Sequence, residues 1–273
     1  MPDNIVTVDF RRHLLLESGD LVLDLGSGNG RHTTEACRWP CRVVSVDVNA
    51  EELRRARYFL TASNGASPYE PYTERRRADV PGQAEFIVAD AQHLPFKDGA
   101  FDKVLCTEVL EHIPDDRAGI HEFYRVAKPG AGMAVSVPRY GPERLFWRLS
   151  WEYWHTPGGH IRVYRPGQLA EYLQEQGFEL HTVRHRHAFQ AVYWFLRCTF
   201  GKEHESRLLP RAMFRFNNWY HTARSPFIER IEAIANLLIG KDMTLYGRKP
   251  ASVNAFRERP DEAAASHARP SAG

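Results

Sequence analysis

The chain has 273 residues, a formal net charge of +2 and a hydrophobic fraction of 43%. This length is enough for one large α/β domain with an elaboration, and a charge so close to zero disfavours a nucleic-acid-binding protein. No apolar run could span a membrane, no secretory signal opens the chain, and four scattered cysteines predict reduced thiols in the cytoplasm.

Residues 7–16 are predicted to form a short helix that precedes the first strand. The strand covers residues 21–25, where only Asp24 interrupts an apolar run, as expected for a strand buried on both faces. It ends in the glycine-rich turn 26–30, which leads into a predicted helix over residues 31–38. Glycine lets the backbone turn sharply and approach a ligand closely, and the helix N-terminus offers free N–H groups. The stretch therefore predicts a ligand-binding unit of strand, turn and helix.

The spacing of the glycines discriminates between ligands. The dinucleotide-binding fingerprint is Gly-x-Gly-x-x-Gly, but here Gly30 comes one position early and Arg31 stands where the last glycine would be. A nicotinamide-dependent oxidoreductase that binds NAD is therefore disfavoured. The sequence Asp-x-Gly-x-Gly-x-Gly over residues 24–30 instead resembles motif I of the class I S-adenosylmethionine (SAM) dependent methyltransferases. The resemblance implies that the turn surrounds the methionine part of SAM and that Asp24 binds its ammonium group through the backbone or a water molecule.

An acidic residue, Asp47, closes the second predicted strand, residues 42–46. An acid at this position can accept hydrogen bonds from both ribose hydroxyls of an adenosine, because two carboxylate oxygens match two neighbouring donors. Asp47 would do so for NAD as for SAM, and it could instead cap the helix predicted over residues 49–60. Asp47 therefore indicates a nucleoside ligand without choosing one.

After this helix a loop carries the basic cluster Arg75–Arg77, which we interpret as a solvated face. The third strand, residues 86–89, is followed by the segment 90–96, with the sequence ADAQHLPF across the junction. This order of residues resembles the adenine-binding segment of the same methyltransferases. A carboxylate accepts from the adenine amino group and small apolar neighbours hold the ring face, so we expect Asp90 and Ala91 to contact adenine.

The fourth strand, residues 101–106, leads into the segment 107–115, TEVLEHIPD. This segment resembles the EVLEH-(I/V)-P-D stretch of the subfamily that includes the ubiquinone and menaquinone methyltransferases, and the resemblance places it where the transferable methyl points. Three interpretations stay open. His112 could be the general base for a substrate hydroxyl, because the unperturbed pKa of histidine is near neutral. Glu108, Glu111 and His112 could hold a divalent metal on one helical face, or Glu111 and His112 could fix the loop.

Past a helix that ends in Lys128-Pro129-Gly130 and a fifth strand over residues 133–138, the sequence changes character. Residues 139–165 concentrate tryptophan, tyrosine and histidine, and in the resembled fold this lid segment covers the methyl acceptor. An aromatic lid is the expected lining for an apolar or ring-containing acceptor. The sequence Gly-His-x-Arg-x-Tyr that begins at Gly159 resembles the lid end of the quinone-type methyltransferases. His160 is therefore the first candidate for acceptor contact or general base, with a hinge residue as the alternative.

A predicted helix over residues 167–176 and a sixth strand over residues 178–184 follow. A seventh, antiparallel strand is expected only at residues 243–248, so residues 185–242 form an insertion between the sixth and seventh strands. The tail, residues 251–273, is rich in alanine, proline, serine and charge and is predicted to be disordered.

Apolar residues recur at helical spacing in the insertion, over residues 188–198 and 227–239, so we expect helices there. We favour helices that pack over a hydrophobic acceptor pocket. The alternative is an amphipathic surface that makes a peripheral membrane contact, with four basic side chains near the lipid headgroups. These side chains are Arg197, Lys202, Arg211 and Arg215.

The elements together predict a Rossmann-like α/β fold with a seven-stranded sheet, a helical lid and a helical insertion. We expect the methyltransferase domain to comprise residues 1–184 and 243–250. The resemblance implies that SAM is the cofactor and that residues at the ends of four strands bind it. These residues are Asp24, Gly26, Ser27, Gly28, Gly30, Asp47, Val48, Asp90, Ala91, Thr107 and Glu108.

The predicted activity is transfer of a methyl group from SAM to an oxygen or carbon atom of a small, hydrophobic or lipid-like acceptor. His160 and His112 are the catalytic candidates, and no metal is assigned. One alternative is a methyltransferase for a sugar or glycolipid headgroup, which would use the aromatic residues as stacking platforms. Another is a non-catalytic SAM-binding or membrane-adaptor protein.

Overall fold

The computed structural model describes residues 6–62, 82–223 and 225–251. Its strands are β1 (Leu21–Leu25), β2 (Arg42–Asp47), β3 (Gln83–Val88), β4 (Phe101–Thr107), β5 (Ala127–Pro138), β6 (Glu179–Arg186) and β7 (Asp242–Arg248). They form one seven-stranded sheet in the order β3-β2-β1-β4-β5-β7-β6. The predicted basic cluster Arg75–Arg77 lies outside the described residues, as does the predicted tail beyond residue 251.

The strands are parallel except for the last one. β7 runs antiparallel to both of its neighbours, β5 and β6, whereas β1 pairs in parallel with β2 and β4. The chain proceeds outward from β1 to β3 and then returns to β4 on the other side of β1, so the strand order reverses between β1 and β4. Open α/β sheets bind ligands beyond the carboxyl ends of the strands at such a point. The predicted sheet with its antiparallel seventh strand is confirmed.

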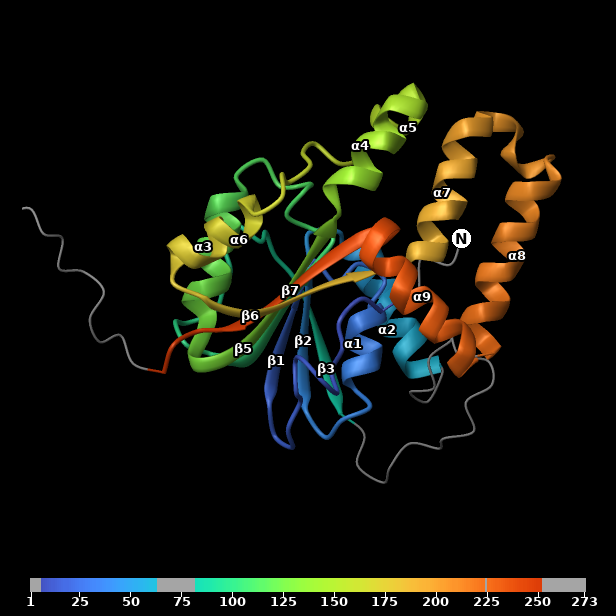
Figure 1. Cartoon of the computed structure of the whole chain (residues 1–273). Coiled ribbons are helices and arrows are strands. Elements are labelled where there is room, and N and C mark those ends of the chain that lie inside the picture. Colours follow the sequence, from blue (N-terminus) through green and yellow to red (C-terminus); the bar gives the residue numbers. More distant parts are fainter. Residues whose placement is uncertain (1–5, 63–81, 224, 252–273) are drawn as a thin grey trace, which may run out of the picture.

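Helices cover both faces of the sheet, and a further group stands beside it (Figure 1). α4 and α5 rise from the end of β5, and α7, α8 and α9 lie between β6 and β7 in the sequence (Figure 1). None of the helices within the described ranges combines the length and the hydropathy needed to cross a membrane. The helices are α1 (Arg31–Ala36), α2 (Ala50–Ala62), α3 (Asp116–Val126), α4 (Tyr140–Leu149), α5 (Trp151–Trp154), α6 (Gln168–Gln176), α7 (Ala188–Phe200), the 3-10 helix η1 (Gly201–Glu205), α8 (Leu208–Ala223) and α9 (Pro226–Ile239).

The predicted N-terminal helix over residues 7–16 is wrong, because this segment forms a turn. The Asp9 carboxylate accepts hydrogen bonds from the backbone N–H groups of Arg11 and Arg12, at 3.1 and 3.0 Å. A short acidic side chain that binds the next backbone donors competes with helix formation. The other predicted elements lie within a few residues of their observed positions, except that β5 begins at Ala127 instead of residue 133.

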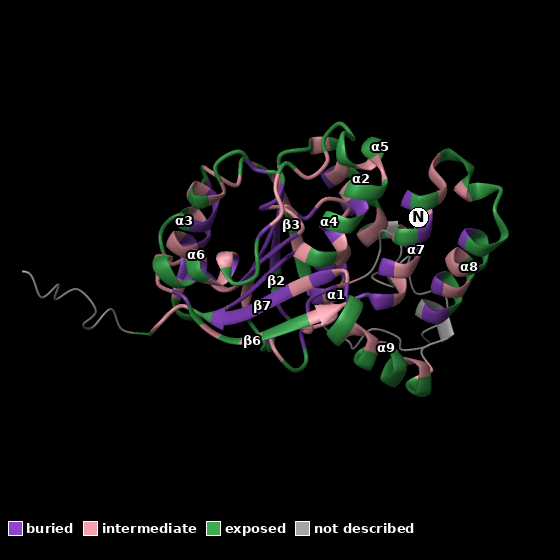
Figure 2. Cartoon of the chain, turned by 45° about the horizontal axis from the view of Figure 1, so that its top comes forward, coloured by how far each residue is buried: buried purple, intermediate pink, exposed green. Residues whose placement is uncertain are grey.

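The central strands of the sheet are the most deeply buried part of the described protein, whereas the edge strands β3 and β6 are partly exposed (Figure 2). Val22 and Leu23 on β1 are both 0% exposed and pack on opposite faces of the sheet. Leu23 belongs to a cluster with residues of α3 and α6, and Val22 to a cluster with α1 and the N-terminal segment. The four cysteines are buried and free. In contrast, the outward faces of α8 and α9 are exposed (Figure 2).

Candidate active site

The glycine turn follows β1 at the point where the strand order reverses. Gly26, Gly28 and Gly30 have φ angles of 68°, 52° and 78°, in the left-handed region that favours glycine. A Cβ atom at Gly26 would lie 2.0 Å from a methyl group of Val109, and one at Gly30 would lie 2.7 Å from Ala56 Cβ. A Cβ atom at Gly28 would meet nothing within 4 Å. Two of the glycines are therefore required by packing, while Gly28 leaves open space in which a ligand can approach the backbone.

Asp24 lies behind this turn and not on its surface. The side chain is 0% exposed, and its Oδ2 accepts a hydrogen bond of 2.6 Å from the Thr33 hydroxyl. Burial raises the pKa of Asp24 to about 6. Its Oδ1 has no hydrogen-bond partner among the described residues, although it is buried. A buried acceptor without a donor, next to an open glycine turn, fits the ammonium group of SAM reached through an intervening water.

Asp47 binds the same turn from β2. Its Oδ2 accepts a hydrogen bond of 2.8 Å from Gly28 N, and its Oδ1 accepts one of 2.8 Å from Asn49 N. Asn49 itself caps α2, because its Oδ1 accepts from Glu51 N at 3.0 Å. Asp47 is therefore not the helix cap, and its carboxylate lies at the predicted ribose position beside the open turn. Next to it Val48 is 74% exposed, which offers an apolar surface to a ring.

The predicted adenine contacts follow β3, the next strand. Ala89 N donates to Asp47 O at 3.2 Å, so the chain segments that bear Asp47 and Asp90 run side by side. The Asp90 carboxylate accepts from Gln92 N at 2.9 Å, and hydrogen bonds from Gln92 lower the pKa of this carboxyl. Asp90 is thus an ionised, half-exposed acceptor at the edge of the sheet, with Ala91 beside it.

β4 brings Thr107 and Glu108 to the same edge. Thr107 is buried, and its hydroxyl lies 3.1 Å from His32 Nδ1. Glu108 has a φ of 58°, a strained conformation for a residue other than glycine, and its Oε1 accepts from the Ser136 hydroxyl at 3.1 Å. Burial, followed by the charge of Asp242, raises the pKa of Glu108 to about 7. Backbone strain of this kind is often found at functional sites.

The structure therefore brings most of the predicted cofactor residues to one edge of the sheet, beyond the carboxyl ends of β1 to β4. Gly28, Asp47, Val48 and Asp90 face outward there. Asp24, Ser27 and Thr107 are buried behind them, and the Ser27 hydroxyl accepts a hydrogen bond of 2.7 Å from Ser45. We expect Ser27 and Thr107 to act through the backbone that they hold.

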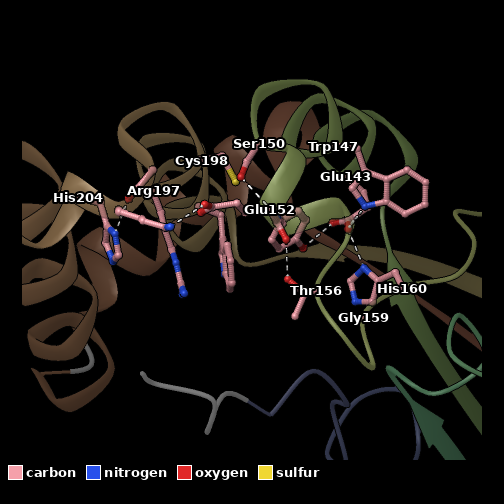
Figure 3. A pocket seen from close by; sticks show the side chains of 14 residues that line it. Glu143, Trp147, Ser150, Glu152, Thr156, Gly159, His160, Arg197, Cys198 and His204 are labelled. Carbon is pink, nitrogen blue, oxygen red and sulfur yellow. Dashed lines mark hydrogen bonds and ion pairs between the residues drawn. The ribbon is translucent and has the colours of Figure 1, made fainter.

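The lid segment contributes a histidine held by a carboxylate. His160 Nδ1 lies 2.6 Å from Glu143 Oε1, and Glu143 is 1% exposed. Glu143 also accepts from Trp147 Nε1 at 3.0 Å and from the Tyr153 hydroxyl at 3.2 Å (Figure 3). Because a carboxylate only accepts hydrogen bonds, the proton of neutral His160 sits on Nδ1 and the lone pair on Nε2. The arrangement is that of a general base oriented by a carboxylate.

The second catalytic candidate, His112, lies against the first. The ring centroids of His112 and His160 are 5.0 Å apart, and His112 Nδ1 lies 3.1 Å from the carbonyl oxygen of Gly159. Burial, followed by the nearby His160, lowers the pKa of His112. Glu111 beside them is 0% exposed, and both of its carboxylate oxygens lack a hydrogen-bond partner among the described residues. Burial, followed by Glu108, raises the pKa of Glu111 well above its usual range.

A metal could be held here, but not by the predicted set. Residues 108–115 form a loop and α3 begins only at Asp116, so the expectation that Glu108, Glu111 and His112 share a helical face is wrong. In the described residues, Glu111, His112 and His160 instead offer ligand atoms within 4.8 Å of one another. Nitrogen and carboxylate ligands suit several divalent transition metals.

The loop that bears Glu111 and His112 is fixed by an arginine that the sequence analysis did not single out. Arg162 donates to the carbonyl oxygens of Leu110 and Pro114, at 2.8 and 2.6 Å, and to that of Ile113. A planar guanidinium group can serve several acceptors at once, which a lysine cannot. Arg162 therefore fixes the loop together with His112, whose Nδ1 lies 3.1 Å from Gly159 O, whereas the Glu111 carboxylate makes no hydrogen bond among the described residues.

A cavity of about 380 Å³ lies between the lid segment and the insertion. Glu143, Trp147 and His160 line one end of it, and Arg197 and His204 line the other (Figure 3). The sequence analysis missed Glu143, because the partner that marks it, His160, lies 17 residues later in the chain.

A family profile described as methyltransferase domain matches residues 7–183. A ubiquinone biosynthesis O-methyltransferase from Hahella chejuensis is 30% identical over 187 residues, which cover 66% of this chain and 72% of that protein. A demethylmenaquinone methyltransferase from Corynebacterium urealyticum is 34% identical over 126 residues, or 46% of this chain and 45% of that protein. A sterol 24-C-methyltransferase from Eremothecium gossypii is 31% identical over 121 residues, or 44% of this chain. The chain spans only 28% of the length of that sterol methyltransferase.

Solved structures agree on the fold. A SAM-dependent methyltransferase from Methanosarcina mazei superposes with a TM-score of 0.56 and 20% identity, covering 90% of this chain and 100% of that one. The [4+2]-cyclase SpnF also gives a TM-score of 0.56, with 19% identity, covering 89% of this chain and 79% of that one. Likeness at such identities concerns the fold alone. The profile match over more than half of the residues, together with the strand order, shows that this chain belongs to the methyltransferase-domain family as a class I, SAM-dependent member.

Proposed function

We propose that this protein transfers a methyl group from SAM to an oxygen or carbon atom of a small, hydrophobic or lipid-like acceptor. The observation that carries the proposal is the cavity beside the lid segment. It is lined by aromatic residues, including Trp147, Tyr153 and Trp194, and it has the Glu143–His160 pair at one end. Relatives named for ubiquinone, demethylmenaquinone and sterol methylation support an acceptor of this class.

SAM supplies an electrophilic methyl group when it is bound. The residues of this chain then have two tasks. The cavity would hold the acceptor hydroxyl beside His160, and Nε2 of His160 would take the hydroxyl proton. Glu143 stabilises the imidazolium that results, because its Oε1 is already 2.6 Å from Nδ1. For methylation at carbon, the same base would remove a proton from the acceptor ring, either from the reacting carbon or from a hydroxyl group on the ring.

Incubation of the purified protein with radiolabelled SAM and a panel of quinones, phenols and lipids tests this function. We expect label in at least one hydrophobic acceptor. Label found only in sugars or proteins would refute the proposed acceptor class. A glycolipid headgroup is a second acceptor to include, because Arg197 and His204 make the other end of the cavity polar.

Binding of SAM without any turnover across the panel would instead favour the non-catalytic alternative, and the fold shared with a cyclase makes that control necessary. A cytoplasmic location is part of the proposal, supported by the four buried, free cysteine thiols. A peripheral contact with a membrane would let a lipid-like acceptor reach the cavity without crossing water.

A further inference from the structure

α8 presents an exposed face that mixes apolar and basic side chains. Leu208, Arg211, Ala212, Arg215 and Trp219 are exposed and recur every three or four residues, so they share one side of the helix. We call this set the α8 face. Leu208 is 84% exposed and Trp219 51%. The other side of the helix packs on α7 (Figure 1).

The charges on the α8 face itself are of one sign. α8 contains two arginines and no acidic residue, whereas Arg207, directly before it, pairs with Glu203. Basic residues beside exposed leucine and tryptophan are typical of helices that lie in the plane of a membrane surface. The apolar side chains enter the headgroup layer there, and the cations meet lipid phosphates. Nucleic acid would pair with the same arginines but would leave the exposed Leu208 without a partner.

A second cavity, of about 280 Å³, lies beside the α8 face between α7, η1 and α8. Arg211 and Arg215 line it together with Tyr193 and His204. Two guanidinium groups and a phenol form a donor set that suits phosphate oxygens. Glu205 also lines the cavity, and its Oε1 lies 3.9 Å from His204 Nε2.

The two cavities adjoin at His204, which lines both of them. In the larger cavity His204 lies at the end opposite to His160 (Figure 3). A phosphate group held in the smaller cavity would therefore stand at the outer end of the cavity assigned to the acceptor.

We propose that the α8 face and the arginine-lined cavity bind the phosphate groups of an anionic lipid bilayer, and so place the outer end of the acceptor cavity at the bilayer surface. This inference rests on the proposed lipid-like acceptor. It adds a binding surface, a ligand chemistry and a direction of entry: the acceptor passes from the bilayer along the lid segment toward His160.

Co-sedimentation of the full chain with lipid vesicles tests the inference. We expect salt-sensitive binding to vesicles of phosphatidylglycerol mixed with phosphatidylcholine, and weaker binding to phosphatidylcholine alone. The double variant Arg211→Gln, Arg215→Gln should bind the anionic vesicles about 30-fold more weakly, which is the effect of two cations near such a surface. The variant Leu208→Gln should weaken binding to both kinds of vesicle.

The matched control is Lys97→Gln with Arg165→Gln, which removes two exposed cations outside the insertion and should leave vesicle binding unchanged. Equal loss in this control would mean that general charge and not the α8 face drives binding, and would overturn the inference. So would unchanged binding of the Arg211, Arg215 variant, or binding of inorganic phosphate or a short RNA without binding of vesicles. Because the assay contains no methyl donor, a failure of methyl transfer and a failure of docking are separate results. Circular dichroism spectra matching the unsubstituted chain show that the variants are folded.

Discussion

The two candidate histidines differ in what their ring nitrogens contact. His160 Nδ1 lies 2.6 Å from a buried carboxylate, whereas His112 Nδ1 lies 3.1 Å from a backbone carbonyl. A carboxylate orients an imidazole and holds its Nδ1–H more firmly than a neutral carbonyl does. Burial lowers the pKa of His112 and opposes its protonation. We therefore propose His160 as the base, with Glu143 as the group that orients it.

Replacing Glu143 by Gln keeps a hydrogen-bond acceptor near His160 but removes the charge. We expect the turnover of a hydroxyl acceptor to fall about 100-fold, while SAM affinity stays the same. Initial rates and calorimetric SAM titration measure the two quantities. Tyr153→Phe is the control, because it removes another partner of Glu143 and leaves the charge in place. If the Glu143→Gln variant turns over at the normal rate, His160 is not the base.

Gly28→Ala tests the open side of the glycine turn. A methyl group there would occupy space where the cofactor is expected, so we predict that the Kd for S-adenosylhomocysteine rises at least tenfold. Gly19→Ala is a matched control: both glycines have a positive φ, 52° and 88°, and a Cβ atom at either would meet nothing within 4 Å. Each change should destabilise the fold by about 1 kcal/mol. If both variants lose similar stability but only Gly28→Ala binds S-adenosylhomocysteine more weakly, the predicted site is supported. Equal Kd values for the two variants would mean that the ligand binds elsewhere.

At the scale of elements, the Arg162 side chain joins the end of the lid segment to the loop before α3. The same loop carries Glu111 and His112, and the Tyr164 hydroxyl strengthens the junction by donating to Asp116 Oδ2 at 2.6 Å. The position of the catalytic candidates thus depends on contacts between two segments about fifty residues apart in the sequence.

Arg162→Ala leaves the carbonyl oxygens of Leu110 and Pro114 without these donors. We expect a loss of about 2 kcal/mol in the free energy of unfolding and a roughly tenfold lower turnover, with SAM affinity unchanged. Arg162→Lys should recover little turnover, because an ammonium group cannot serve the three carbonyl groups in the same geometry. Urea denaturation and initial rates provide the measurements. Full recovery by lysine would show that charge alone matters at this position.

The sequence predicts those helices and strands that a local pattern of residues specifies. It does not reveal side chains that interact with residues far away in the sequence. The glycine turn and the apolar strands are visible locally, so they were placed correctly. The prediction of a helix at residues 7–16 was wrong because the Asp9 side chain accepts hydrogen bonds from the backbone N–H groups of the residues that follow it. The role of Glu143 depends on its contact with His160, which lies 17 residues later in the sequence. The pair of His187 with Asp242, 55 residues apart at 2.7 Å, is equally invisible without the fold.

At the scale of the whole molecule, the buried Asp24 links stability to pH. Burial raises its pKa from 3.8 to about 6, so the folded protein holds a proton that the unfolded chain releases near pH 4. Stability contributed by such a group is present at low pH and is lost as pH rises through the folded pKa. A shift of about two units corresponds to about 3 kcal/mol.

Comparison with Asp24→Asn isolates this effect from that of other carboxyl groups. Between about pH 4 and pH 6.5, the SAM-free unsubstituted protein should lose about 3 kcal/mol of unfolding free energy relative to the variant. Urea denaturation across this range measures the difference. Parallel pH curves for the two proteins would mean that Asp24 is not desolvated as the structure describes.

The place of β7 between β5 and β6 has a consequence for synthesis on the ribosome. β7 is hydrogen-bonded to both strands and comes after the whole insertion in the sequence. Until residues 242–248 emerge, β5 and β6 each present an unpaired edge, and unpaired edges are sites of aggregation. The nascent chain must therefore keep an unfinished sheet apart from other chains while α7, α8 and α9 are made. A chain that terminates before Asp242 would keep the facing edges of β5 and β6 unpaired.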